Sequence, residues 1–252
     1  MIEVFILSII QGVTEFLPIS SSSHLILISN YISFENQGLS IDVSLHIGSF
    51  LAVILYFKKD ILNFVQNKDL FFKIFVSSIP VMLVGYFLVH FNFINYLRDV
   101  KIIGWTTLIF GGVLFISDKF EIKNSIKNNF NYKSAIFIGV LQILSLIPGV
   151  SRSGITISAA RILKINRYDS AKISFLLSIP TLAAVSLFGL NNLLYSEDLV
   201  FSILNVLSIF LSFIFSFITI KFFMKYIKNF SLNIFVLYRL ILGIILLLIS
   251  YL

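Results

Sequence analysis

Two short polar stretches interrupt an otherwise apolar chain, and both carry side chains suited to chemistry on a charged group. The first runs from Gln11 to His24 and holds the carboxylate of Glu15, an imidazole and four consecutive serines. The second runs from Gln142 to Gly154 and holds the guanidinium of Arg152 between two serines. Because a carboxylate in a membrane is costly and marks a site by default, we interpret the two stretches as halves of one site. The alternative is a polar lock between helices.

The first stretch contains the candidate nucleophile and base. Gln11 and Glu15 are four residues apart and therefore share one face of a helix. A helix beginning at Ser20 would also place His24 beside Ser21, as a hydroxyl and imidazole pair. Serines equally cap helices, and a histidine equally fills a structural hydrogen bond, so this pair alone is ambiguous. The catalytic candidates here are Glu15, Ser21 and His24, and the substrate-binding candidates are Gln11, Ser20 and Ser22.

The second stretch is suited to binding an anion. Free backbone amides at a helix N-terminus bind phosphate, and a guanidinium such as that of Arg152 adds two parallel hydrogen bonds. Neutralising Glu15 is the simpler role for Arg152, and the two roles are compatible. We take Arg152 as catalytic, and the substrate-binding candidates here are Ser151, Ser153, Gly154 and Thr156. With the first stretch they predict a site for a phosphorylated substrate, with acid–base chemistry available.

A further acid and imidazole, Asp42 and His46, lie four residues apart near the start of a later apolar run. We expect them either to support the site from behind or to join a metal site. The spacing of a single pair is weak evidence for either role.

The elements that position these residues are membrane helices. The chain is 58% hydrophobic and 12% charged, whereas soluble domains carry about a quarter charged residues. Apolar runs long enough to span a bilayer recur along it. The net charge of +7 is therefore interpreted as basic cytoplasmic loops and not as a nucleic-acid surface. Cysteine is absent, which excludes disulfides and thiolate metal sites.

The order of spans and breaks predicts an all-α polytopic membrane protein, with one domain over 1–252. Moving Pro18 onto Pro148 also lays later spans on later spans, which predicts repeats over 1–120 and 132–252. Each repeat would hold a re-entrant helical hairpin and three transmembrane helices, so the second would be inverted relative to the first. The expected half-helices are 1–17, 25–32, 134–147 and 151–163, and the expected spans are 41–57, 71–89, 102–117, 170–190, 199–220 and 233–252. Charged or polar loops are expected over 58–73 and 118–133.

Loop charge predicts the orientation. One side would carry Lys58, Lys59, Lys68, Lys73, Lys119, Lys123, Lys127, Lys133, Arg161, Lys164, Arg167, Lys172, Lys221, Lys225 and Lys228. The other would carry Arg98 and Lys101 against Glu35, Asp99, Glu197 and Asp198. The first side is therefore expected to be cytoplasmic. The first hairpin would then enter from outside and the second from the cytoplasm, with their tips meeting inside the membrane.

At these residues the chain resembles the undecaprenyl-diphosphate phosphatase family, also called the bacitracin-resistance protein family. One family motif, Pro-Gly-x-Ser-Arg-Ser-Gly-x-Thr, is complete from Pro148 to Thr156. The other reads Gln11, Glu15, then Pro18 to His24, and the resemblance covers essentially the whole chain. Gln11 replaces the glutamate of many members, which weakens a two-carboxylate metal site. Ser23 replaces the usual glycine, and this matters only if the position needs a positive φ.

The resemblance implies hydrolysis of undecaprenyl diphosphate to undecaprenyl phosphate and inorganic phosphate on the outer face of the bacterial plasma membrane. This would recycle the carrier lipid of cell-wall synthesis and give bacitracin resistance. It also implies a divalent cation, Mg²⁺ or Ca²⁺, with Glu15 and Gln11 as candidate ligands. The expected partners are the polyprenyl diphosphate and the membrane, without nucleic acid, and a homodimer is left open.

Two other function classes compete with a phosphatase. An inverted-repeat transporter or lipid flippase fits the broken helices equally well, and release of phosphate distinguishes it from a phosphatase. A structural membrane scaffold is disfavoured because it needs no polar turns within hydrocarbon.

Overall fold

The structure is a computed structural model that describes residues 1–31, 38–63, 68–91, 93–126, 130–195 and 203–252. Over these residues the regular structure is helical, and the only β contact is an isolated bridge between Asn124 and Ile165. Six of the described helices are long and apolar enough to cross a membrane. They are α3 (Leu39–Tyr56), α5 (Lys68–His90), α6 (Val100–Asp118), α10 (Arg167–Tyr195), α11 (Ile203–Asn229) and α12 (Asn233–Tyr251). The prediction of an all-α polytopic membrane protein is confirmed.

Two pairs of shorter helices accompany the spans. In the sequence, one pair precedes α3 and the other lies between α6 and α10. The first hairpin consists of α1 (Ile2–Thr14) and α2 (Ser21–Tyr31), and the second of α8 (Tyr132–Gln142), the 3₁₀ turn η2 (Ile143–Leu146) and α9 (Arg152–Ile162). A bilayer crossing needs about 20 helical residues, so none of these helices spans it alone. Partners within each pair are in contact. The expected breaks at Pro18 and Pro148 both fall between the paired helices.

One predicted loop is wrong. Residues 58–73 were expected to be a charged loop, but α4 (Lys58–Asn63) forms at its start and α5 begins at Lys68. The charges here stabilise helix ends, since Asp60 pairs with Lys172 and Asp69 with Lys73 one turn along α5. A 3₁₀ helix, η1 (Phe93–Arg98), joins α5 to α6. The first residues of the predicted span 199–220 lie outside the described residues.

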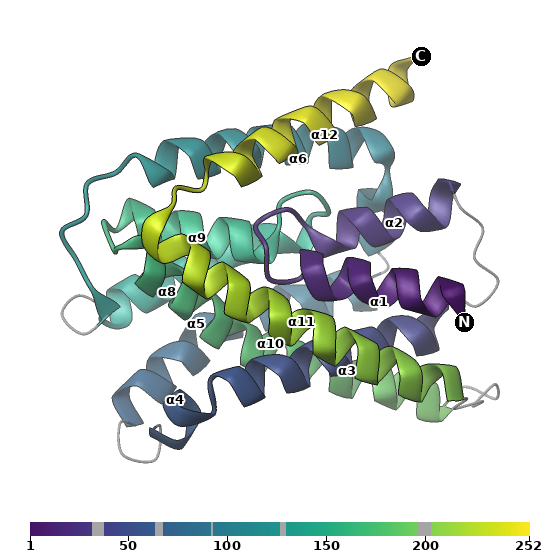
Figure 1. Ribbon diagram of the computed structural model, residues 1–252, viewed down its shortest axis with the longest axis horizontal. Helices are drawn as coiled ribbons and strands as arrows, with labels where there is room; N and C mark the ends of the chain where they lie inside the picture. Colours follow the sequence, from purple (N-terminus) through teal and green to yellow (C-terminus); the bar gives the residue numbers. More distant parts are fainter. Residues whose placement is uncertain (32–37, 64–67, 92, 127–129, 196–202) are drawn as a thin grey trace.

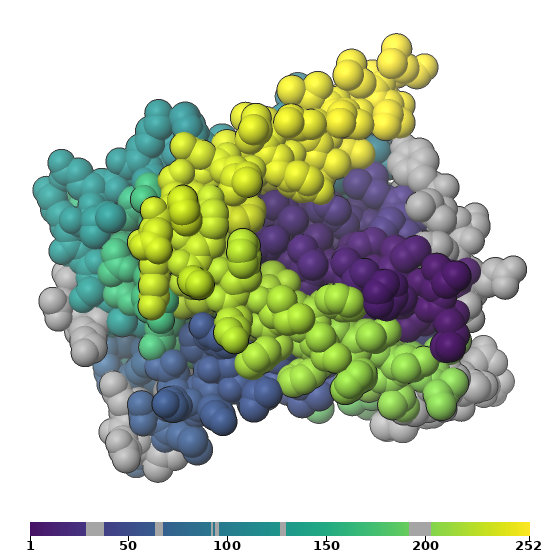
Figure 2. Space-filling view, in the orientation of Figure 1, coloured from purple at the N-terminus to yellow at the C-terminus, as the bar shows by residue number. Residues whose placement is uncertain are grey.

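The two halves of the chain pack across each other rather than side by side as separate units. Helix α1 packs on α11 and α8 on α5, while α3 contacts α10 and α6 contacts α12 (Figure 1). In Figure 2 the first hairpin lies between α11 and α12, and many large apolar side chains of these two helices are exposed. The largest buried cluster gathers Phe16, Phe175 and Phe223. The division into two inverted repeats stays a prediction.

Several helix junctions meet at one charged end. Asp118, at the end of α6, accepts two hydrogen bonds from Arg167, lies 3.6 Å from Arg161 Nε and accepts from the amide of Leu232. The Lys172–Asp60 pair adds α4, which follows α3 directly, to this group. Both chain termini lie at the opposite end (Figure 1). Of the charges used to predict orientation, Glu35, Lys127, Glu197 and Asp198 lie outside the described residues.

Candidate active site

The tips of the two hairpins touch. Ser153 Oγ in the second hairpin donates to the Leu17 carbonyl of the first at 2.7 Å. In the other direction, the amide of Gly149 donates to Ser20 Oγ at 3.3 Å. Two turns that are far apart in the sequence are therefore joined by hydrogen bonds, and the prediction that the hairpin tips meet is confirmed.

Each turn ends in a serine with a left-handed backbone. Ser20 has φ 75° and Ser151 has φ 70°, a region that non-glycine residues seldom adopt. Each serine directly precedes a helix, and Ser151 Oγ caps α9 by accepting from the amide of Gly154 at 3.1 Å. The two helix N-termini therefore face the same place, which favours an anion there. Ser23, by contrast, is helical and buried within α2, so serine is unstrained at this position of the motif.

A buried arginine on α12 holds both turns. Arg239 is 0% exposed and donates to the carbonyls of Pro18, Gly149 and Val150 at 3.2, 2.7 and 3.0 Å. It also reaches the Thr107 carbonyl on α6 at 3.3 Å. Carbonyl groups buried inside a protein nearly always accept a hydrogen bond. Here one guanidinium donates to buried carbonyls of both hairpins. Arg239 is thus a positioning residue of the site.

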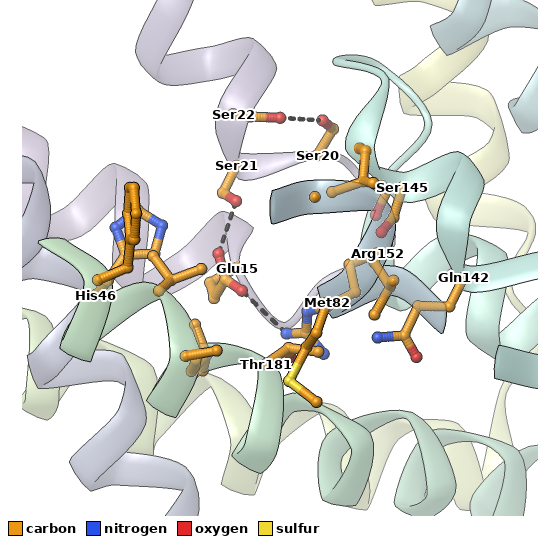
Figure 3. A pocket seen from close by; sticks show the side chains of 18 of the residues that line it. Glu15, Ser20, Ser21, Ser22, His46, Met82, Gln142, Ser145, Arg152 and Thr181 are labelled. Atoms are coloured by element: carbon orange, nitrogen blue, oxygen red, sulfur yellow. Dashed lines mark hydrogen bonds and ion pairs between the residues drawn. The ribbon is translucent and has the colours of Figure 1, made fainter. Parts of the chain in front are cut away.

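The two predicted charges form the centre of the site. Arg152 Nη2 lies 2.9 Å from Glu15 Oε1, and both side chains are largely buried. The other carboxylate oxygen, Oε2, accepts from Ser21 Oγ at 2.7 Å and from Gln11 Nε2 at 3.1 Å. Three donors therefore hold Glu15 in its ionised form, and the carboxylate is placed to take the proton of Ser21 (Figure 3).

Arg152 is supported from the side opposite Glu15. Its Nη1 donates to the Ser174 carbonyl of α10 at 3.3 Å. Thr156 Oγ1 bonds to Ser174 Oγ at 2.7 Å and to the Arg152 carbonyl at 2.8 Å. Thr156 is fully buried, so it contacts the residues that hold Arg152 and not the open space in front of it.

A cavity of about 620 Å³ opens beside this centre. Its polar lining includes Glu15, Ser20, Ser21, Ser22, His46, Gln142, Ser145, Ser151, Arg152 and Thr181 (Figure 3). The remaining wall is mainly apolar and comes from α5 and α10. It includes Val81, Met82, Val89, Leu182, Val185 and Phe188. A charged centre that faces an apolar wall is suited to a ligand with a charged head and a hydrocarbon body.

The two histidines among the predicted site residues, His24 and His46, are placed differently. His24 has both ring nitrogens occupied, with Nδ1 2.6 Å from the Ser20 carbonyl and Nε2 2.6 Å from the Tyr238 hydroxyl. It does not line the cavity, whereas His46 does. His46 Nδ1 lies 2.7 Å from the Asp42 carbonyl, which can only accept a hydrogen bond, so Nδ1 carries a proton. The Asp42 side chain does not line the cavity.

The sequence-predicted residues thus separate into two groups. Glu15, Ser20, Ser21, Ser22, His46, Ser151 and Arg152 line the cavity, whereas Gln11, His24, Asp42, Ser153, Gly154 and Thr156 lie around or behind it. Gln142 and Ser145 line the cavity although sequence reasoning gave them no role. A signal was available, because Gln142 lies 131 residues after Gln11, as Ser151 does after Ser20.

The oxygens around Glu15 meet a minimal requirement for a divalent cation. Gln11 Oε1 is buried without a partner and belongs to a side chain that already contacts the carboxylate. No group of three or more His, Cys, Asp or Glu side chains suited to a metal occurs within the described part of the chain. Mg²⁺ typically takes one or two protein carboxylates and completes its shell with substrate phosphate oxygens and water. Glu15 and Gln11 fit such a shared site and not an all-protein one.

Comparisons with known proteins agree over nearly the whole chain. A sequence model of the family described as "Bacitracin resistance protein BacA" matches residues 4–245. The "Undecaprenyl-diphosphatase" of Pelagibacter ubique (strain HTCC1062) is 49% identical over 251 residues, which cover 99% of this chain and 98% of that protein. Proteins with the same name from Jannaschia sp. (strain CCS1) and Alcanivorax borkumensis are 38% and 39% identical. Those alignments cover 98% and 97% of this chain, and 97% of each relative.

Proposed function

Since the chain belongs to the bacitracin resistance protein BacA family, we propose that its cavity hydrolyses undecaprenyl diphosphate to undecaprenyl phosphate and inorganic phosphate. The protein is an integral membrane hydrolase, and its activity accounts for the bacitracin resistance that gives the family its name. The single observation that carries the proposal is the contact of Ser21 and Arg152 with one buried carboxylate, Glu15, in the lining of a mainly apolar cavity.

The shape of the cavity supports a lipid-linked substrate. The diphosphate would lie at the polar head, where Arg152 and the N-termini of α2 and α9 favour negative charge. The prenyl chain would lie along α5 and α10, whose facing side chains in the cavity are mostly apolar. A water-soluble diphosphate would leave this wall without a partner, so the apolar lining favours a polyprenyl substrate.

The hydrogen bonds around Glu15 support a serine nucleophile. Ser21 Oγ would attack the terminal phosphorus while its proton passes to Glu15 Oε2, 2.7 Å away. The new Oγ–P bond forms as the bond from phosphorus to the bridging oxygen breaks, and the lipid monophosphate leaves. Water then cleaves the phosphoserine and releases inorganic phosphate. Arg152 neutralises the charge on the phosphoryl oxygens throughout, which is the main requirement of phosphoryl transfer.

The surrounding residues would position this pair. His24, tied to the Ser20 carbonyl and to Tyr238, fixes the start of α2 and thereby Ser21. A divalent cation, Mg²⁺ or Ca²⁺, would be held by Glu15 and Gln11 together with the diphosphate, and would supply further neutralising charge. We place the site on the outer side of the bacterial plasma membrane, because the junctions gathered around Asp118 at the other end are basic.

Release of phosphate tests the proposal. Purified protein in detergent should release inorganic phosphate from undecaprenyl diphosphate, and a chelator should lower the rate. Glu15→Gln keeps the size of the side chain but cannot accept a proton from Ser21, so the rate should fall at least ~100-fold. Movement of labelled lipid across vesicles without phosphate release would instead identify a transporter and refute the proposal.

A further inference from the structure

Gln142 is a polar residue in the cavity wall whose contacts within the protein do not explain its presence. It lies on the other side of Arg152 from Glu15 (Figure 3). Gln142, at the end of α8, is 0% exposed to solvent. Both atoms of its amide, Nε2 and Oε1, are buried without a hydrogen-bond partner, yet the residue lines the cavity. Buried amides are nearly always hydrogen-bonded, so this one is completed by something that enters the cavity.

The matching residue of the first hairpin shows what is different about Gln142. Gln11 lies in the last turn of α1, as Gln142 does in α8. Its Nε2 donates to Glu15, four residues later, at 3.1 Å. The residue four positions after Gln142 is Leu146, which offers no acceptor. The second hairpin therefore keeps the amide but lacks the carboxylate, and its donor is free for a ligand that brings its own negative oxygens.

Figure 3 places Arg152 between the two polar walls, with Glu15 and Ser21 on one side and Gln142 on the other. Ser145, one turn after Gln142, lines the cavity on the same side. A diphosphate has two phosphoryl groups joined by one oxygen, so two donor sets on either side of one guanidinium match its form. The Ser21 side holds the phosphoryl group that is attacked.

We propose that Gln142, with Ser145, binds the phosphate that remains on the lipid. The assignment of this phosphate to Gln142 follows from the fold, because α8 and η2 pack against α5, one wall of the apolar cavity. Gln142 is thus a specificity-determining residue that recognises the lipid-linked phosphate of both substrate and product. This inference rests on the proposed phosphatase function.

Product inhibition separates the two phosphates experimentally. Hydrolysis of farnesyl diphosphate would be measured with farnesyl phosphate or inorganic phosphate as the competing inhibitor. In Gln142→Met, which keeps the length of the side chain, the Ki of farnesyl phosphate should rise about tenfold or more, as expected when a hydrogen bond to a charged group is lost. The Ki of inorganic phosphate should stay within about twofold, because the terminal phosphate is held elsewhere.

Thermal stability distinguishes this role from a structural one. Removing an amide that has no partner in the protein should leave the Tm unchanged or raise it, whereas loss of a structural residue would lower the Tm. Ser186→Ala is the matched control, because Ser186 Oγ is also buried without a partner but does not line the cavity. It should change neither Ki. Gln142→Glu places a like charge against the phosphate and should raise the Ki of farnesyl phosphate further than Gln142→Met.

An unchanged Ki of farnesyl phosphate in both Gln142 variants would overturn the inference while leaving the phosphatase function intact, provided the wild type releases phosphate. An equal rise for both inhibitors would also overturn it, since the lipid-linked phosphate would not be singled out. A wild type that releases no phosphate would instead refute the proposed function.

Discussion

Exchange of Arg152 for lysine should separate the geometry of the guanidinium from its charge. Arg152 donates from Nη2 to Glu15 at 2.9 Å and from Nη1 to the Ser174 carbonyl at 3.3 Å. Its planar group can keep these two contacts and still present an N–H to a phosphate. The ammonium of a lysine is a single point on a flexible stem, so it can satisfy Glu15 or a phosphate but cannot hold the fixed fork.

The expected magnitude follows from the bonds lost. One charge-assisted hydrogen bond to the transition state is worth about 1.5–3 kcal/mol, so kcat/KM should fall about 10- to 150-fold in Arg152→Lys. Stability should change little, because Glu15 keeps a cationic partner. Arg152→Met removes that partner and leaves a buried carboxylate unpaired, which costs about 3–5 kcal/mol of stability. The additional change Glu15→Gln should then restore stability without restoring activity.

The assay is phosphate release from undecaprenyl diphosphate in detergent, with the Tm of each variant measured in parallel. Arg98→Lys is the control, because Arg98 is exposed in η1 and does not line the cavity. It should match the wild type in both measurements. The reasoning is refuted if Arg152→Lys retains kcat/KM within about threefold of the control, since the fork would then contribute less than one ordinary hydrogen bond.

Two more substitutions test the nucleophile and the second turn. Ser21→Ala should reduce kcat at least ~1,000-fold with little change in Tm, because the Glu15–Arg152 pair remains; substantial turnover would favour an attacking water molecule instead. Gly149→Ala should lower both Tm and activity, since Gly149 has φ +95° and an added Cβ would lie 2.0 Å from Thr106 Oγ1. Gly112→Ala is its control, because nothing lies within 4 Å of the added Cβ, and this protein should remain as stable as the wild type.

The pairing of Glu15 with Arg152 was predictable from the sequence for a simple reason. A carboxylate within apolar sequence needs a cation, and few charged residues occur inside apolar runs of this chain. The spans were predictable from hydropathy and the turns from their prolines and serines. The charged residues of α4 were misread as a loop because charge also marks helix ends near a membrane surface.

The surroundings of the centre could not be predicted in the same way. Tyr238 and Arg239 stand in the apolar run of α12, and only the packing of α12 shows that they reach His24 and the two turns. The separate places of His24 and His46 likewise depend on which face of α2 and α3 meets the cavity. The positive φ in this turn falls at Ser20 and not at Ser23, which is helical, and a backbone angle of this kind is not encoded by residue type alone.

The bonds of Arg239 also bear on the order in which the protein is made. The first hairpin leaves the ribosome early and the second midway, while α12 follows every other described helix along the chain. Until α12 is in place, the carbonyls of Pro18, Gly149 and Val150 lack the donor that holds them in the finished protein. The two turns therefore acquire their full set of hydrogen bonds only once α12 has packed against them, after both hairpins have been made.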